Sequence, residues 1–141
     1  MSQSDIDYVG RFLAAFGAGD KEQLAKLVHP DFENPQSSAL PYGGQTYRGL
    51  DGFYKFALGI FPSTWQIERF DVLRRFYEPG TKPDEESVVL LFHMVGKVAA
   101  TGEPVDTTLA EHWIFKDGKL LYSKPHWFEP PRKAAELSKK S

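Results

Sequence analysis

The chain has 141 residues, of which 41% are hydrophobic, so it has the size of one domain with a single core. Its formal net charge is −2 and its basic residues are scattered, which excludes the electrostatic footprint of a nucleic-acid-binding protein. The absence of cysteine excludes disulfides and thiolate metal sites and is typical of a reducing compartment. No apolar stretch is long enough to span a bilayer, so we expect a soluble, cytoplasmic protein with no membrane partner and no nucleic-acid partner.

Two helices are expected at the N-terminus, joined as a hairpin. Apolar residues recur at helical spacing over residues 6–16, and Gly17 ends that pattern. Asp20, with Gln23 three residues later, predicts the N-cap of a second short helix that stops before Pro30.

A third helix is expected after a loop. The brief extended segment at 31–34 leads into a Pro- and Gly-rich stretch at 35–44. Apolar residues at helical spacing from Leu50 to Phe61 then predict a helix that ends at Pro62.

The rest of the chain predicts four antiparallel strands in a meander. Residues 65–76 alternate between apolar and polar with a slip in the middle, which indicates a bulged or curved strand. Further strands are expected at 87–99, 107–115 and 120–128, with an Asp-Gly pair at 117–118 forming a tight hairpin turn.

This order of elements predicts an α+β fold, with three N-terminal helices packed on a curved antiparallel sheet. We expect one domain over residues 1–128, followed by a charged tail at 129–141. Three short helices cannot cover both faces of such a sheet. We therefore expect one face to enclose a pocket and the outer face to form a homodimer.

Glu111 is the most unusual residue of the predicted sheet. By the two-residue period of a strand it shares a face with Leu109, Trp113 and Phe115, and that face is otherwise apolar. A carboxylate in such surroundings should have a raised pKa or a dedicated partner, which makes Glu111 a site candidate. The alternative is a bulged or edge strand, in which Glu111 is solvated and His112 points inward.

Three stretches carry a resemblance to a known family: FLAAFGAGD at 12–20, LPYGG at 40–44 with YRG at 47–49, and WIFKDGKL at 113–120. They resemble the nuclear transport factor 2 (NTF2) superfamily, specifically its SnoaL-like members, which are related to polyketide cyclases and ketosteroid isomerase. The resemblance extends over about residues 5–128 and implies a cone-shaped α+β barrel with an internal apolar pocket. It says little about the reaction, because this fold hosts many activities.

The resemblance to ketosteroid isomerase assigns positions in that pocket. The isomerase uses a carboxylate base, together with a tyrosine and a protonated carboxylic acid that bind the oxyanion. Glu111 matches the protonated acid, whereas Asn34 matches the base and Phe12 matches the tyrosine. Tyr54 matches a further pocket tyrosine and could supply the missing hydroxyl.

The resemblance to SnoaL-type cyclases adds one candidate. Their acid/base aspartate on the last strand corresponds to about Pro125, and a shift of one residue places His126 there. The candidate catalytic residues are therefore Glu111, Asn34, Tyr54 and His126.

The candidate substrate-binding residues are aromatic or lie on the inferred pocket face: Phe12, Phe53, Trp65, Phe92, Met94, Trp113, Ser123 and Trp127. Leu90, Leu109 and Leu121 share the inferred pocket face with them. The four histidines have no metal-ligand spacing, so we expect no metal. An aromatic pocket with one acid favours a hydrophobic, oxygenated small molecule as ligand.

These observations predict a cofactor-independent enzyme that uses acid/base chemistry, as an isomerase, cyclase, hydratase or dehydratase. Its substrate would be polyketide-, terpenoid- or steroid-like. A non-catalytic binding protein for a lipophilic ligand stays open, because Phe12 and Asn34 stand at two of the family's catalytic positions. An interaction domain with a partner groove on the outer sheet face is a third possibility.

Overall fold

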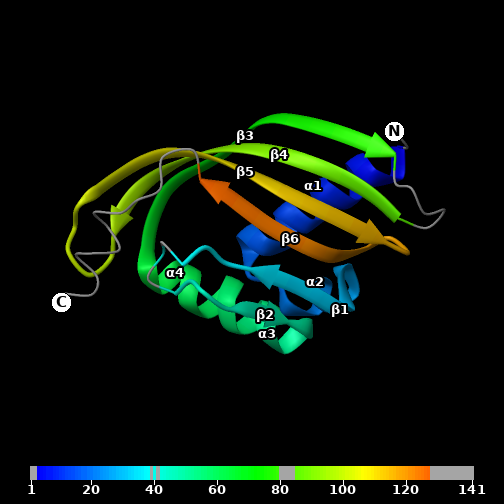
Figure 1. Cartoon of the computed structure of the whole chain (residues 1–141), viewed down its shortest axis with the longest axis horizontal. Helices are drawn as coiled ribbons and strands as arrows, with labels where there is room; N and C mark the ends of the chain where they lie inside the picture. Colours follow the sequence, from blue (N-terminus) through cyan, green and yellow to red (C-terminus); the bar gives the residue numbers. More distant parts are fainter. Residues whose placement is uncertain (1–2, 39, 41, 80–84, 128–141) are drawn as a thin grey trace.

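The computed structural model describes residues 3–38, 40, 42–79 and 85–127. Within them, helices lie against the concave face of a strongly curved sheet, which confirms the expected α+β architecture (Figure 1). Phe128 and the predicted tail at 129–141 lie outside the described residues. No helix among the described residues is long and apolar enough to cross a membrane.

The N-terminal hairpin consists of α1 (Gln3–Ala18) and α2 (Lys21–Leu27). The Asp20 side chain accepts a hydrogen bond from the Gln23 backbone N–H at 3.2 Å, so the predicted N-cap of the second helix is confirmed. Val9 and Phe12 of α1 are buried, since their spacing places them on the face that meets the sheet.

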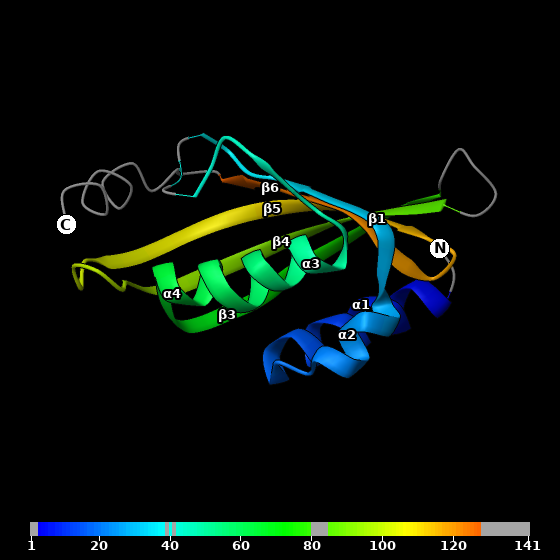
Figure 2. The same cartoon turned by 90° about the horizontal axis from the view of Figure 1, so that it is seen from below.

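The third helix is longer than predicted, because it continues past Pro62. It comprises α3 (Gly49–Lys55), a π-helical turn (Phe56–Ile60) and α4 (Phe61–Thr64). Pro62 lies in the first turn of α4, where proline is tolerated. The prediction that Pro62 ends the helix was therefore wrong. Figure 2 shows α3 and α4 on the same face of the sheet as α1 and α2, as a separate group.

The described residues form a six-stranded sheet in the order β2-β1-β6-β5-β4-β3. The strands are β1 (Val28–Pro35), β2 (Thr46–Arg48), β3 (Trp65–Pro79), β4 (Glu85–Val98), β5 (Pro104–Lys116) and β6 (Lys119–Trp127). β1 pairs with β6 in parallel and all other pairs are antiparallel.

The predicted four-stranded meander is thus only part of the sheet. The extended segment at 31–34 belongs to β1, and β2 was not predicted. β1 joins the sheet by pairing with β6, far away in the sequence, and no local pattern reports such a contact. The sheet is open, with β2 and β3 at its edges, so the cone is not a closed barrel.

Two local features of the strands were predicted. The pairing of β3 with β4 shifts register between Ile67 and Arg69, and again after Val72, so the expected bulged and curved strand is confirmed. The hairpin turn at 117–118 is also confirmed. Both of its residues have positive φ, 53° at Asp117 and 75° at Gly118, as a two-residue turn of this kind requires.

The alternation along β5 places Glu111 on the concave face. Leu109, Trp113 and Phe115 are buried there, whereas His112 lies on the convex face with its ring 5.6 Å from that of Tyr122. Because β5 pairs with both β4 and β6, it is not an edge strand. The alternative of a solvated Glu111 on an edge strand is therefore wrong.

Candidate functional site

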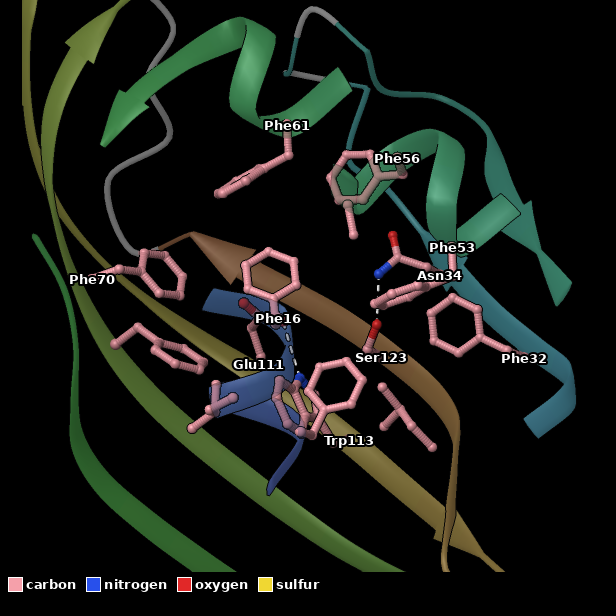
Figure 3. A pocket seen from close by; sticks show the side chains of 15 residues that line it. Phe16, Phe32, Asn34, Phe53, Phe56, Phe61, Phe70, Glu111, Trp113 and Ser123 are labelled. Carbon is pink, nitrogen blue, oxygen red and sulfur yellow. Dashed lines mark hydrogen bonds between the residues drawn. The ribbon is translucent and has the colours of Figure 1, made fainter. Parts of the chain in front are cut away.

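An aromatic cavity of about 80 Å³ lies between the helices and the concave face of the sheet (Figure 3). Among the described residues, its lining includes eight phenylalanines and only three polar side chains, those of Glu111, Asn34 and Ser123. The apolar lining residues are Phe12, Leu13, Phe16, Phe32, Phe53, Phe56, Ala57, Phe61, Phe70, Phe92, Trp113 and Leu120.

Glu111 extends into this cavity from the middle of β5. Burial raises the pKa of its carboxyl from 4.5 to about 7, and a hydrogen bond from Trp113 partly opposes that shift. The Trp113 Nε1–H donates to Glu111 Oε1 at 3.0 Å. Near neutral pH the carboxyl therefore exists in both the protonated and the ionised form, so it can either give or take a proton.

Asn34 and Ser123 form a second polar group of the lining. The parallel pairing of β1 with β6 brings them together, and Asn34 Nδ2 donates to Ser123 Oγ at 2.6 Å. Gln36 Nε2 donates a hydrogen bond to Asn34 Oδ1. Both polar atoms of the Asn34 amide therefore have hydrogen-bond partners, which fix its orientation. A primary amide has two N–H donors, which leaves Asn34 with a second one that no described residue accepts.

Tyr42 lies buried close to this site, although it is not part of the lining. Trp65 Nε1 donates to its hydroxyl oxygen at 3.0 Å. Burial raises the pKa of Tyr42, the Trp65 hydrogen bond opposes the shift, and the negative charge of Glu111 adds to it. The Tyr42 hydroxyl is therefore neutral at physiological pH. Tyr42 was not among the site residues predicted from the sequence.

Seven of the candidate residues line the cavity. They are Glu111, Asn34, Phe12, Phe53, Phe92, Trp113 and Ser123. The structure brings them together from α1, α3, β1, β4, β5 and β6. Their catalytic and binding roles stay predictions.

Tyr54 and His126, the other two catalytic candidates, do not line the cavity. The Tyr54 hydroxyl donates to the Lys21 backbone carbonyl at 2.9 Å, which ties α3 to α2. His126 is exposed near the end of β6 and lines a separate groove beside Gln36. Neither position gives the side chain a described contact with Glu111.

Three substrate-binding candidates also lie elsewhere. Trp65 is buried and bonded to Tyr42, and Met94 is buried in the core. Trp127 lines the separate groove with His126 and packs on Trp65 at 6.0 Å between ring centroids. Alternation along the strands put Met94 and Trp127 on the inferred pocket face, and Trp65 was chosen as an aromatic. Alternation does not tell how far along a strand the cavity extends.

Most of the missed lining residues come from the helices. Phe16 follows Phe12 by four positions, and Ala57 and Phe61 follow Phe53 at the same interval, so a helical-face argument could have found them. Phe56 lines the cavity from the π-helical turn, which no sequence signal indicated. On β6, Leu120 lines the cavity where Leu121 was expected, because the pairing of β5 with β6 shifts register after Ile114.

The described residues contain no group of three or more His, Cys, Asp or Glu side chains placed to hold a metal ion. The expectation of a site without metal or cofactor stays a prediction.

The comparisons with known proteins agree with this geometry. A family model described as a SnoaL-like domain matches residues 9–122. The chain therefore belongs to the SnoaL-like domain family. The resemblance found in the sequence is confirmed.

Two solved structures illustrate the shared fold. An NTF2-like protein from Burkholderia thailandensis superposes with a TM-score of 0.72 at 18% sequence identity, covering 99% of this chain and 97% of that chain. A candidate ketosteroid isomerase from Shewanella frigidimarina gives a TM-score of 0.67 at 14% identity, with 89% of this chain and 96% of that chain covered. At such identities the likeness shows the fold alone, and it confirms the NTF2-like cone.

A curated relative matches over a shorter stretch. The ECF RNA polymerase sigma factor SigJ of Mycobacterium tuberculosis is 36% identical over 56 residues, which is 38% of this chain. That stretch spans 18% of the length of the sigma factor.

Proposed function

We propose that this protein is a cofactor-independent enzyme that moves a proton on a hydrophobic carbonyl compound, with Glu111 as the proton donor and acceptor. The observation that carries the proposal is a carboxyl group with a pKa of about 7 in a cavity lined by phenylalanines. An acid/base catalyst works best when its pKa lies near the working pH. Membership of the SnoaL-like family supports the general class of protein.

The reaction that the site supports begins with ionised Glu111. Its carboxylate takes a proton from the carbon next to the substrate carbonyl. The electron pair of that C–H bond forms a C=C bond to the carbonyl carbon, and the π pair of the C=O bond moves to the oxygen, giving an enolate. The second N–H of Asn34 is available to bind that oxygen. In a substrate with a C=C bond beyond the deprotonated carbon, the enolate is a conjugated dienolate, and return of the proton from Glu111 to the far carbon of that double bond gives the conjugated isomer and restores the carboxylate.

Glu111 is the only titratable side chain among the described lining residues, so the same carboxyl group must remove and return the proton. This differs from the arrangement implied by the isomerase resemblance, where a base and a protonated acid are separate residues. Phe12 and Asn34 occupy the other two positions, and neither can exchange a proton.

The test is the exchange of substrate protons with solvent, because it needs no knowledge of the natural substrate. The protein is incubated in D₂O with a panel of hydrophobic ketones, and NMR follows the loss of the protons next to the carbonyl. We expect the Glu111→Gln variant to slow the catalysed exchange about 100-fold or more. The exposed Glu68 on β3 provides a matched control, and Glu68→Gln should leave the rate unchanged.

Full exchange activity in a folded Glu111→Gln variant would show that Glu111 is not the catalyst. The second candidate function, a binding protein for a lipophilic ligand, is favoured by the replacement of two catalytic positions by Phe12 and Asn34. It predicts saturable binding of ketones by the wild type with no exchange above the rate in buffer.

We also propose a cytoplasmic homodimer that associates through the convex face of the sheet. Phe76 lies on that face opposite Val89 and is 57% exposed, and Leu91 and Ile114 are half-buried on the same face. Light scattering after gel filtration should give twice the monomer mass, and Leu91→Glu should give the monomer mass. A wild-type protein that is monomeric at micromolar concentration would contradict this proposal.

A further inference from the structure

The cavity around Glu111 is too small to hold a whole substrate. Its volume is about 80 Å³, whereas a cavity of about 150 Å³ is known to bind benzene and typical ligand sites have about 300–1,000 Å³. The space beside Glu111 therefore accepts the head of a ligand, such as a carbonyl with a few neighbouring atoms. The rest of the ligand must lie elsewhere.

A groove of about 740 Å³ adjoins the cavity. It lies between the C-terminal end of α1, the segment from the π-helical turn to Pro62, and β3. Cavity and groove share lining residues: Leu13, Phe16, Ala57, Phe61 and Phe70. Figure 3 shows the side chains of Phe16, Phe61 and Phe70 on the side of the cavity where Glu111 lies.

Polarity changes along this path. The three polar side chains of the cavity come from β1, β5 and β6, strands that contribute no described residue to the groove. Beyond the shared phenylalanines the groove presents apolar side chains such as Leu58, Ile67 and Val72. Lys21 is the one charged residue among the described residues that line it. A ligand with a polar head and an apolar chain therefore fits in one orientation only, with the head at Glu111.

We propose that the ligand is an extended amphiphile, a carbonyl compound whose unbranched apolar chain lies in the groove between α1, α4 and β3. That the head is a carbonyl group rests on the proposed function, whereas the presence of an apolar chain is inferred from the groove alone. A carbonyl within a fused ring system is a poor fit, because even one ring needs more space than the cavity beside Glu111 provides. This narrows the expected substrates away from steroid-like compounds and toward long-chain ones.

The experiment measures binding by calorimetry for linear methyl ketones from 2-hexanone to 2-dodecanone. Each added methylene should tighten binding about fourfold while the chain extends along the groove. A compact ketone with the same number of carbons, 1-decalone, should bind roughly tenfold more weakly than 2-decanone.

Two substitutions on β3 form a matched pair. Ile67 lines the groove and is 37% exposed, whereas Leu73 is 48% exposed on the same strand and does not line it. Ile67→Glu should weaken binding by a factor that grows with chain length and reaches roughly tenfold for 2-dodecanone. Leu73→Glu should bind the whole series like the wild type.

Three results would overturn the inference: affinities independent of chain length, tighter binding of 1-decalone than of 2-decanone, or equal losses in the two variants. The inference would also be overturned if none of the ketones bound to the protein. Proton exchange in D₂O is measured on the same compounds and separates the two proposals. Binding that depends on chain length but gives no exchange supports the groove and contradicts the catalytic role of Glu111. Exchange with affinities that do not depend on chain length supports the catalytic role of Glu111 and contradicts the groove.

Discussion

The two faces of the central strands β4 and β5 use the same backbone and have different chemistry. On the concave face, Phe92 and Trp113 are buried under the helices, and Glu111 among them acquires a raised pKa. On the convex face, His93 reaches Asp106 at 2.7 Å, and the Asp106 side chain is 73% exposed. The difference shows that the helices, which cover one face only, convert an ordinary carboxylate into a candidate catalyst.

The largest expected effect is on stability, from removing a concave-face side chain. Phe92→Ala should lower the free energy of unfolding by about 3–5 kcal/mol, because Phe92 is fully buried and its removal leaves a cavity. Leu91→Ala, one residue along on the half-buried convex face, should lower it clearly less. Urea unfolding of both variants measures the two values. Equal losses would show that the convex face is packed as tightly as the concave one.

The second effect is the pH dependence of stability caused by Glu111. The pKa of this carboxyl is about 7 in the folded protein and 4.5 as an ordinary group, so the folded state binds more protons between these values. Stability therefore falls as pH rises from about 4.5 to 7, by about 3 kcal/mol in total.

Glu111→Gln removes this dependence. Urea unfolding at pH 4 and at pH 8 gives the difference in unfolding free energy between the variant and the wild type. From pH 4 to pH 8 this difference should shift by about 3 kcal/mol in favour of the variant. The same substitution at the exposed Glu68 is the control. A stability difference between Glu111→Gln and wild type that is the same at both pH values would contradict the raised pKa.

A smaller effect is expected from the hydrogen bond of Trp113. Its Nε1–H stabilises the ionised form of Glu111, so Trp113→Phe should raise the pKa of Glu111 above about 7. Hydrogen bonds to charged groups contribute about 1.5–3 kcal/mol, which corresponds to a shift of roughly one to two pH units. NMR titration of ¹³C-labelled glutamate measures the shift. A lower pKa in the variant would show that the indole does not donate to the carboxylate.

The smallest effect is expected on the convex face. Asp106→Asn removes the partner of His93, and an exposed pair of this kind contributes about 0–1 kcal/mol. Unfolding at pH 6 should therefore give nearly the same free energy as the wild type. A loss above roughly 2 kcal/mol would mean that the pair is shielded from solvent.

The sequence by itself determined the features that depend on neighbouring residues. The alternation along 107–115 put Glu111 on the apolar side of its strand, and the Asp20 cap and the Asp-Gly turn at 117–118 followed from short-range rules. These features are local because a strand has a period of two and a cap needs three residues. The resemblance to the SnoaL-like family then supplied the fold.

Only the tertiary structure decided which residues share the cavity with Glu111. The parallel pairing of β1 with β6 brings Asn34 next to Ser123, 89 positions away in the sequence. The register shift after Ile114 places Leu120 in the cavity lining, where Leu121 was expected. Tyr54 lies outside the cavity, and its hydroxyl donates a hydrogen bond to the Lys21 carbonyl of α2. Such contacts depend on how distant segments pack, and the raised pKa of Glu111 depends on them too, because burial is a property of the whole fold.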